Sequence, residues 1–116
     1  MRTLFKISIP VEAGNRSIAD GSMPQTIQSI LAEQKPEAAY FVAEHGHRTG
    51  FLVMDVKSPS DIPAIAEPWF LAFNAAIEAT PAMTPADLAA AAPGIEAAVR
   101  KFGKLAERHT PGLRAA

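Results

Sequence analysis

The chain opens with an alternation of polar and apolar residues that predicts a β-strand over residues 2–9. The odd-numbered residues Thr3, Phe5, Ile7 and Ile9 fall on one face. The even-numbered residues fall on the other. A period of two is typical of a strand with one buried face. Pro10 ends the pattern, because proline has no amide to donate to a sheet.

Apolar residues recur at helical spacing in two stretches, residues 22–35 and 58–74. In the first, Pro24 lies in the first turn and Pro36 ends the helix. In the second, Pro68 lies inside the helix, where it removes a backbone donor and is expected to cause a kink. The polar residues 12–22 read as an irregular loop with at most a short helical turn.

Three further strands are predicted over residues 37–44, 49–56 and 75–83. Pro81 indicates that the last of them lies at the sheet edge. A third helical region covers residues 84–103, with Thr84 as its cap, an interruption at Pro93-Gly94 and an end at Gly103. The predicted order is β-α-β-β-α-β-α. It indicates an α+β domain over residues 1–103, with a four-stranded antiparallel sheet, followed by a tail of residues 104–116.

The stretch EHGHRTG, residues 44–50, predicts a hairpin with His45-Gly46 as a two-residue type I′ turn. Such a turn needs positive φ at both central positions, which glycine adopts freely and histidine tolerates. The turn sets the register, which pairs Glu44 with His47 and Tyr40 with Phe51. A longer loop would shift these pairs.

Both faces of this hairpin are apolar. One face carries Tyr40, Val42, Phe51 and Val53. The opposite face carries Ala39, Phe41, Ala43, Leu52, Met54 and Val56. An antiparallel sheet with one solvated face should alternate more cleanly. Right-handed crossovers put both connecting helices on one face, so the other face needs another cover. The third helix could cover part of it and a second copy all of it, and we therefore predict a homodimer packed sheet to sheet.

The element order and the two-faced sheet resemble the ferredoxin-like fold of the dimeric α+β barrel superfamily. The stretches IPVEAGN, KPEAAYFVAEHGHRTGFLVMDV, IPAIAEPWF and IEATPAMTPADL also resemble a group of small bacterial proteins of uncharacterised function in that superfamily. The resemblance covers residues 1 to about 102. The superfamily includes muconolactone isomerases, quinone-forming monooxygenases that need no cofactor, and haem-degrading and chlorite-splitting enzymes. No motif here selects one of them, so no catalytic residue is carried over.

Composition narrows the classes of partner. The 116 residues carry a net charge of −1 with no basic stripe, which argues against nucleic acid. The absence of cysteine removes disulfides, thiol nucleophiles and cysteine-bound zinc, and is compatible with a reducing cytoplasm. No apolar run approaches the roughly 20 residues of a membrane span, and the N-terminus lacks the pattern of a signal peptide. We therefore expect a cytoplasmic protein that does not bind membranes.

Two charged residues are the candidates for catalysis. Lys6 lies on the first strand and Glu78 on the fourth, which are neighbours in a ferredoxin-like sheet. If Phe5 and Ile77 face the helices, both charged side chains fall on the other face with Ser8 and with Thr80. A partly buried Lys–Glu pair could do acid/base work, although such pairs are more often structural.

Three more residues are candidates for ligand binding, namely Tyr40, Arg48 and Trp69. The simpler interpretation of Tyr40 is a cross-strand aromatic pair, and that of Trp69 is core packing. Arg48 lies near the hairpin tip, where it could reach the mouth of a barrel. His45 and His47 have chelating spacing, but they flank a turn and lack a nearby third ligand, so neither a metal nor a cofactor is predicted. In residues 12–22, Arg16 could hold an anion, although a solvated loop is the simpler interpretation.

Three functions remain open from the sequence. The first is a dimeric barrel that binds a small molecule of unknown structure. The second is a cofactor-independent isomerase or monooxygenase acting on a small aromatic or lactone-like substrate, which rests on fold analogy alone. The third is a non-catalytic interaction module whose barrel is filled by Phe41, Leu52 and Met54. Whether the protein is an enzyme is left open.

Overall fold

The computed structural model describes residues 1–109, with side chains through Leu105. The chain forms two compact units, residues 1–82 and residues 83–116. The first unit contains these elements: β1 (Arg2–Ile9), α1 (Val11–Ala19), α2 (Met23–Gln34), β2 (Ala38–Glu44), β3 (His47–Asp55), the 3₁₀ turn η1 (Pro59–Asp61), α3 (Ile62–Phe73) and β4 (Ala76–Pro81). The second contains α4 (Pro85–Ala90) and α5 (Ala92–His109). The predicted division at residue 103 stays a prediction.

The four strands form one antiparallel sheet in the order β2-β3-β1-β4. This confirms the α+β prediction, and the order is consistent with a ferredoxin-like βαββαβ fold. β4 lies at the sheet edge, as Pro81 predicted. The central strand β1 alternates as its sequence does, with Phe5 and Ile7 buried and Leu4 and Lys6 partly exposed.

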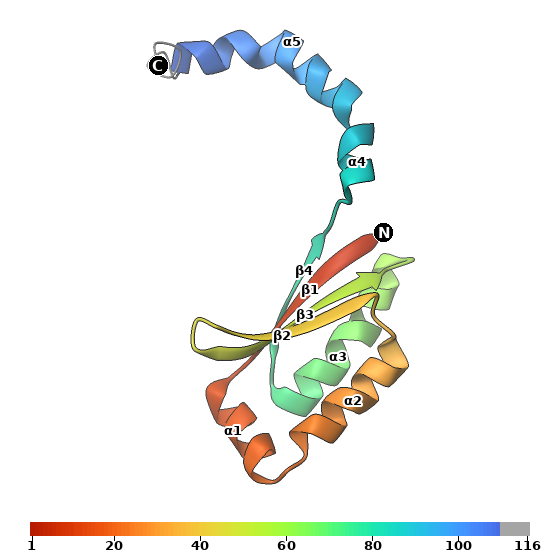
Figure 1. The fold of residues 1–116 in the computed structure, drawn as a ribbon, viewed down its shortest axis with the longest axis vertical. Helices are drawn as coiled ribbons and strands as arrows, with labels where there is room; N and C mark the ends of the chain where they lie inside the picture. Colours follow the sequence, from red (N-terminus) through yellow and green to blue (C-terminus); the bar gives the residue numbers. More distant parts are fainter. Residues whose placement is uncertain (110–116) are drawn as a thin grey trace. The chain divides into compact units, whose positions relative to one another are not determined.

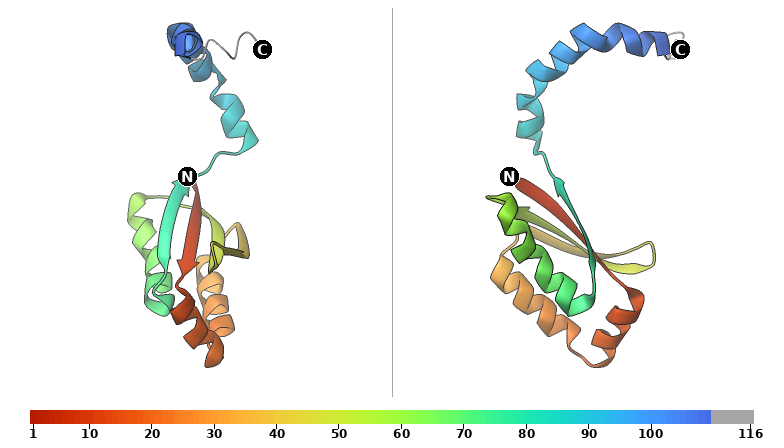
Figure 2. Two further views of the ribbon diagram at one scale, coloured as in Figure 1. Left: turned by 90° about the vertical axis from the view of Figure 1, so that its left-hand side faces the viewer. Right: turned by 180° about the vertical axis from the view of Figure 1, so that it is seen from behind.

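Helices α2 and α3 lie in one layer against a single face of the sheet (Figure 1), and the view from behind in Figure 2 shows the same layer. The core between the layers contains Phe5, Leu52 and Trp69, each of which is fully buried. The ring centroids of Trp69 and Phe73 are 6.0 Å apart. The core of the first unit is therefore built from one sheet face and the inner sides of two helices.

Two positions depart from the predicted helices. The segment predicted as a loop contains α1, a nine-residue helix that begins directly after Pro10. Its polar residues hid the helical pattern, because Gly14 and Ser17 are the side that it buries. In the second unit, α5 continues through Gly103 to His109, so the helix end predicted at Gly103 is wrong. One glycine weakens a helix by only about 1 kcal/mol relative to alanine, which neighbouring residues can offset.

The start of the second unit confirms the predicted cap. The Thr84 side chain accepts a hydrogen bond from the Asp87 amide, and the Asp87 carboxylate accepts one from the Thr84 amide. The predicted interruption falls at Ala91, between α4 and α5. Pro93 therefore lies in the first turn of α5, where its missing amide costs no hydrogen bond. No helix within residues 1–109 is long and apolar enough to cross a membrane.

The hairpin forms as predicted. His45 and Gly46 have φ values of 52° and 78°, both in the left-handed region that a type I′ turn requires. Glu44 pairs with His47 and Tyr40 with Phe51, which confirms the predicted register. The turn therefore fixes which side chains of β2 and β3 share a face.

Candidate functional site

The sheet face opposite α2 and α3 has no helix of residues 1–82 over it (Figure 1). We call this surface the open face. The strand registers place these side chains on it: Arg2, Leu4, Lys6, Ser8, Ala38, Tyr40, Val42, Glu44, His47, Thr49, Phe51, Val53, Asp55, Ala76, Glu78 and Thr80. The predicted condition that Phe5 and Ile77 face the helices is confirmed by the core to which both belong.

Part of the open face is apolar, with side chains from β1, β2 and β3. Tyr40 is 68% exposed and Val42 is 45% exposed. Phe51 lies opposite Tyr40, and Val53 lies opposite Leu4 on β1. A contiguous apolar patch of this kind is typical of a surface that binds a partner or a ligand.

An ion pair lies among these apolar side chains. Lys6 Nζ donates a hydrogen bond to Glu44 Oε1 at 2.8 Å, and each side chain is 29% exposed. The two residues belong to β1 and β2, so the pair reaches across β3. His45 Nε2 lies 3.4 Å from the same carboxylate oxygen. Glu44 thus joins the open face to the hairpin turn.

Both members of the pair stay charged near neutral pH. The hydrogen bond to Glu44 raises the pKa of Lys6, and the nearby Glu78 charge adds to this effect against partial desolvation. The hydrogen bond from Lys6 lowers the pKa of Glu44, and the charges of Lys6 and His45 act in the same direction. Lys6 is therefore a fixed cation, suited to attract a negative or electron-rich atom rather than to accept a proton.

Glu78 lies directly opposite Lys6 on β4, so the two residues share the open face, as predicted. The two side chains, with Ser8 and Ala76, line a hollow of about 240 Å³ on the open face. The hydrogen bond of Lys6 nonetheless goes to Glu44, a residue that the sequence reasoning did not single out. The sequence did contain a signal for Glu44, because the predicted hairpin register puts it on the same face as Tyr40 and Val42.

Arg48 lies on the opposite face of the sheet. Its neighbours in the register are Ile9 and Ala43, both on the helix side. Both terminal guanidinium nitrogens donate to Asn15 Oδ1 at 3.2 Å. A Cβ on Gly14 would come within 2.5 Å of the same guanidinium. The structure thus brings Arg48 to α1 rather than to Lys6 and Tyr40, and Arg16 lies in the last turn of that helix.

Trp69 is also separate from the open face. Its side chain is fully buried in the core under α3, and its Nε1 donates to Gln34 Oε1 at 3.3 Å. The Gln34 amide nitrogen donates in turn to the Ile65 carbonyl oxygen at 2.9 Å. The polar end of the tryptophan is therefore satisfied inside the helix layer, in agreement with its interpretation as core.

The two hairpin histidines contact different groups: His45 Nε2 lies near the Glu44 carboxylate, and His47 contacts the backbone of the turn. His47 Nδ1 lies 3.0 Å from the His45 carbonyl oxygen, which is a contact within the turn. In the part of the chain that the structure describes, no three metal-binding side chains gather.

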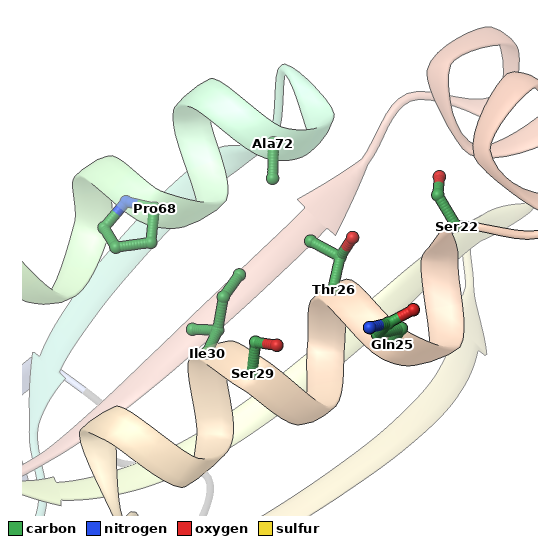
Figure 3. A pocket seen from close by; sticks show the side chains of 7 residues that line it. All are labelled: Ser22, Gln25, Thr26, Ser29, Ile30, Pro68 and Ala72. Atoms are coloured by element: carbon green, nitrogen blue, oxygen red, sulfur yellow. The ribbon is translucent and has the colours of Figure 1, made fainter.

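A second hollow lies between α2 and α3, away from the open face. Figure 3 shows its lining residues: Ser22, Gln25, Thr26, Ser29, Ile30, Pro68 and Ala72. Its volume is about 360 Å³, larger than that of the hollow beside Lys6. The lining offers hydroxyl groups and one amide but no charged group. This hollow therefore offers no charged group to a ligand, whereas the hollow on the open face offers Lys6 and Glu78.

The fold and the open face define a class: an α+β protein with one helix-covered and one uncovered sheet face. The chain belongs to the family described as a domain of unknown function (DUF3303), whose model matches residues 12–96. The matched span includes Glu44, Tyr40 and Glu78. It begins after β1, so Lys6 lies outside it.

No curated protein matched the chain. Among solved structures, a formyltetrahydrofolate deformylase from Pseudomonas putida KT2440 is similar, with 16% sequence identity and a TM-score of 0.44. The alignment covers 71% of this chain and 29% of that one. Similarity at this level carries no inference about function.

Proposed function

We propose that the protein binds a small molecule on the open face and that a second copy of the chain encloses the site. The observation that carries the proposal is the Lys6–Glu44 ion pair set among uncovered apolar side chains. A merely solvated sheet face would carry polar residues at the positions of Tyr40, Val42 and Phe51. The element order also supports membership of the dimeric α+β barrel superfamily.

A second copy is the cover that fits this surface. Packed sheets lie about 10 Å apart, a distance that inward side chains of both sheets fill. The apolar patch on β1, β2 and β3 supplies such side chains. The hollow beside Lys6 and Glu78 lies next to this patch and supplies space. The homodimer is therefore part of the proposed function, with cavity walls from two sheets.

The side chains favour a small aromatic ligand with one polar group. Tyr40 and Phe51 offer ring surfaces, and Lys6 offers a cation for an electron-rich oxygen. Because Lys6 stays protonated, it cannot accept a proton from a ligand. A carboxylate such as Glu78 would have to accept it. We therefore propose binding as the role of the open face.

The experiment uses three probes that share one ring: phenol, benzoate and benzylamine. Ligand-observed NMR against the full chain should show saturable binding of at least one of them. Phe51→Ala should weaken that binding, because it removes a wall of the site. Leu71→Ala is the matched control, since Leu71 is 82% exposed on α3, on the helix layer.

Two outcomes would contradict the proposal. One is the absence of saturable binding by all three probes. The other is binding that Phe51→Ala leaves unchanged, which would place the ligand elsewhere. Preference among the three probes would give the charge class of the ligand.

A further inference from the structure

Four side chains of the open face form one row across the sheet. Tyr40 on β2 lies opposite Phe51 on β3. Phe51 also lies opposite Lys6 on β1, and Lys6 lies opposite Glu78 on β4. We call these four residues the transverse row. Neighbouring strands are about 4.8 Å apart, so each member of the row lies beside the next one.

The transverse row changes its chemical character in a fixed order. Its first two members carry aromatic rings, the third carries a cation and the fourth carries a carboxylate. A ligand that follows the row therefore meets the rings of Tyr40 and Phe51 first, then the Lys6 ammonium, and then Glu78. The molecule that complements this order has an aromatic ring at one end and a hydrogen-bond acceptor and donor at the other.

Both charged members of the row keep hydrogen-bonding capacity for a ligand. Lys6 Nζ carries three N–H groups, and one of them donates to Glu44 Oε1. The Glu78 carboxylate has no hydrogen bond or ion pair with the residues whose side chains the structure describes. The hollow of about 240 Å³ that these two side chains share with Ser8 and Ala76 gives room for a polar group. Such a group can accept from Lys6 and donate to Glu78.

The two opposite charges select against a charged group in this hollow. A carboxylate on the ring would accept from Lys6 but would lie against the Glu78 carboxylate. An ammonium or amidinium on the ring would donate to Glu78 but would lie against the Lys6 ammonium. Like charges brought together at a binding surface cost free energy, and this cost discriminates between ligands. A neutral group that both accepts and donates hydrogen bonds avoids both costs.

We propose that the ligand of the open face is an aromatic compound whose polar group is neutral and both accepts and donates hydrogen bonds, as a carboxamide or a phenol does. The ring lies over Phe51, and the polar group lies in the hollow between Lys6 and Glu78. This inference rests on the ligand site proposed above and names the chemistry of its ligand. It gives Glu78 the role of excluding anions and Lys6 the role of excluding cations.

Benzoate, benzamide and benzamidine test this selection, because the three molecules have nearly the same shape and differ in charge and in hydrogen-bond donors. Ligand-observed NMR against the full chain at neutral pH measures the dissociation constant of each probe. We expect benzamide to bind several-fold more tightly than either charged probe. Benzoate or benzamidine binding as tightly as benzamide would overturn the inference.

Two conservative variants assign the selection to the transverse row. Glu78→Gln removes the negative charge and should improve the binding of benzoate relative to benzamide several-fold. Lys6→Gln removes the positive charge and should improve the binding of benzamidine relative to benzamide. A purely structural role would change the affinity for all three probes by the same factor, and that result would also overturn the inference.

Glu12→Gln is the matched control for the change of charge, since Glu12 lies in the first turn of α1 and not on the open face. It should leave the order of the three probes unchanged. Circular dichroism of each variant monitors folding. If a variant fails to fold, the comparison of the three probes on the parent chain still decides the inference.

The same titrations separate this inference from the proposed function. If a charged probe binds best and Phe51→Ala weakens its binding, the inference is wrong and the proposed ligand site stands. If none of these probes binds saturably, and phenol and benzylamine also fail to bind, the proposed function is contradicted and the inference falls with it.

Discussion

Lys6 and Glu44 form a 2.8 Å ion pair although β3 lies between their strands. The pair crosses the open face at Thr49, which lies between Ser8 on β1 and Val42 on β2 in the strand registers. Thr49 is only 2% exposed, and its hydroxyl donates to the His47 carbonyl oxygen. The Lys6–Glu44 pair and the buried Thr49 therefore form the polar part of the candidate site.

The pair should make stability depend on pH through Glu44. Its pKa is lowered from the ordinary 4.5 in the folded state, so its contribution is present above pH 4.5. The contribution is lost as the pH falls through the lower, folded-state pKa. We expect Glu44→Gln to be slightly less stable than the parent at pH 7, with the difference vanishing at strongly acidic pH. Urea unfolding measures this difference in stability between pH 2 and pH 7, a range that brackets the ordinary carboxylate pKa of roughly 4. A difference that persists unchanged at the acidic end would contradict the assignment.

The open face should control self-association. The parent chain should scatter light with about twice the 12.3 kDa mass of one chain. Phe51→Glu should lower this mass on dilution, because it places a charge in the proposed sheet-to-sheet contact. Leu71→Glu, on the exposed side of α3, should leave the mass unchanged. Equal masses for all three proteins would argue against the sheet contact.

Neighbouring residues on β3 should differ sharply in their effect on stability. Leu52 is fully buried under the helices, whereas Val53 lies on the open face. We expect Leu52→Ala to lower the free energy of unfolding by about 2–5 kcal/mol, the usual cost of a large core truncation. Val53→Ala should cost much less in dilute solution. Urea unfolding at low protein concentration measures both, and similar losses would mean that the open face is covered within one chain.

The hairpin turn should tolerate no branched residue at Gly46. Its φ of 78° is unfavourable for valine, and we expect Gly46→Val to cost about 1–2 kcal/mol. Gly94→Val is the control, since a Cβ at either glycine meets no atom within 4 Å and Gly94 has no positive φ. Thermal unfolding of both variants compares them. An unchanged melting temperature for Gly46→Val would exclude the type I′ turn.

Local patterns were enough to predict most of the first unit. The alternation around Phe5 identified a strand, and His45-Gly46 set the register of the hairpin. Both succeed because a period of two and a two-residue turn leave little freedom in the backbone. Helix α1 escaped prediction because Gly14 and Ser17, which it buries, carry no apolar signal. Gly103 was misread because a glycine ends a helix only where the chain leaves the helical conformation.

The sequence by itself determined that both faces of the hairpin are apolar, and that Lys6 and Glu78 share a face if Phe5 and Ile77 face the helices. It did not distinguish the face of Leu52 from that of Phe51, because both carry similar side chains. Only the tertiary structure decided this, since helices α2 and α3 pack over Leu52 and not over Phe51. Leu52 and Met54 therefore fill the core and not a barrel, contrary to the filled-barrel hypothesis. The tertiary structure also decided the partner of Lys6. Glu78 is its neighbour in the strand register, but the long Lys6 side chain reaches across β3 and donates its hydrogen bond to Glu44.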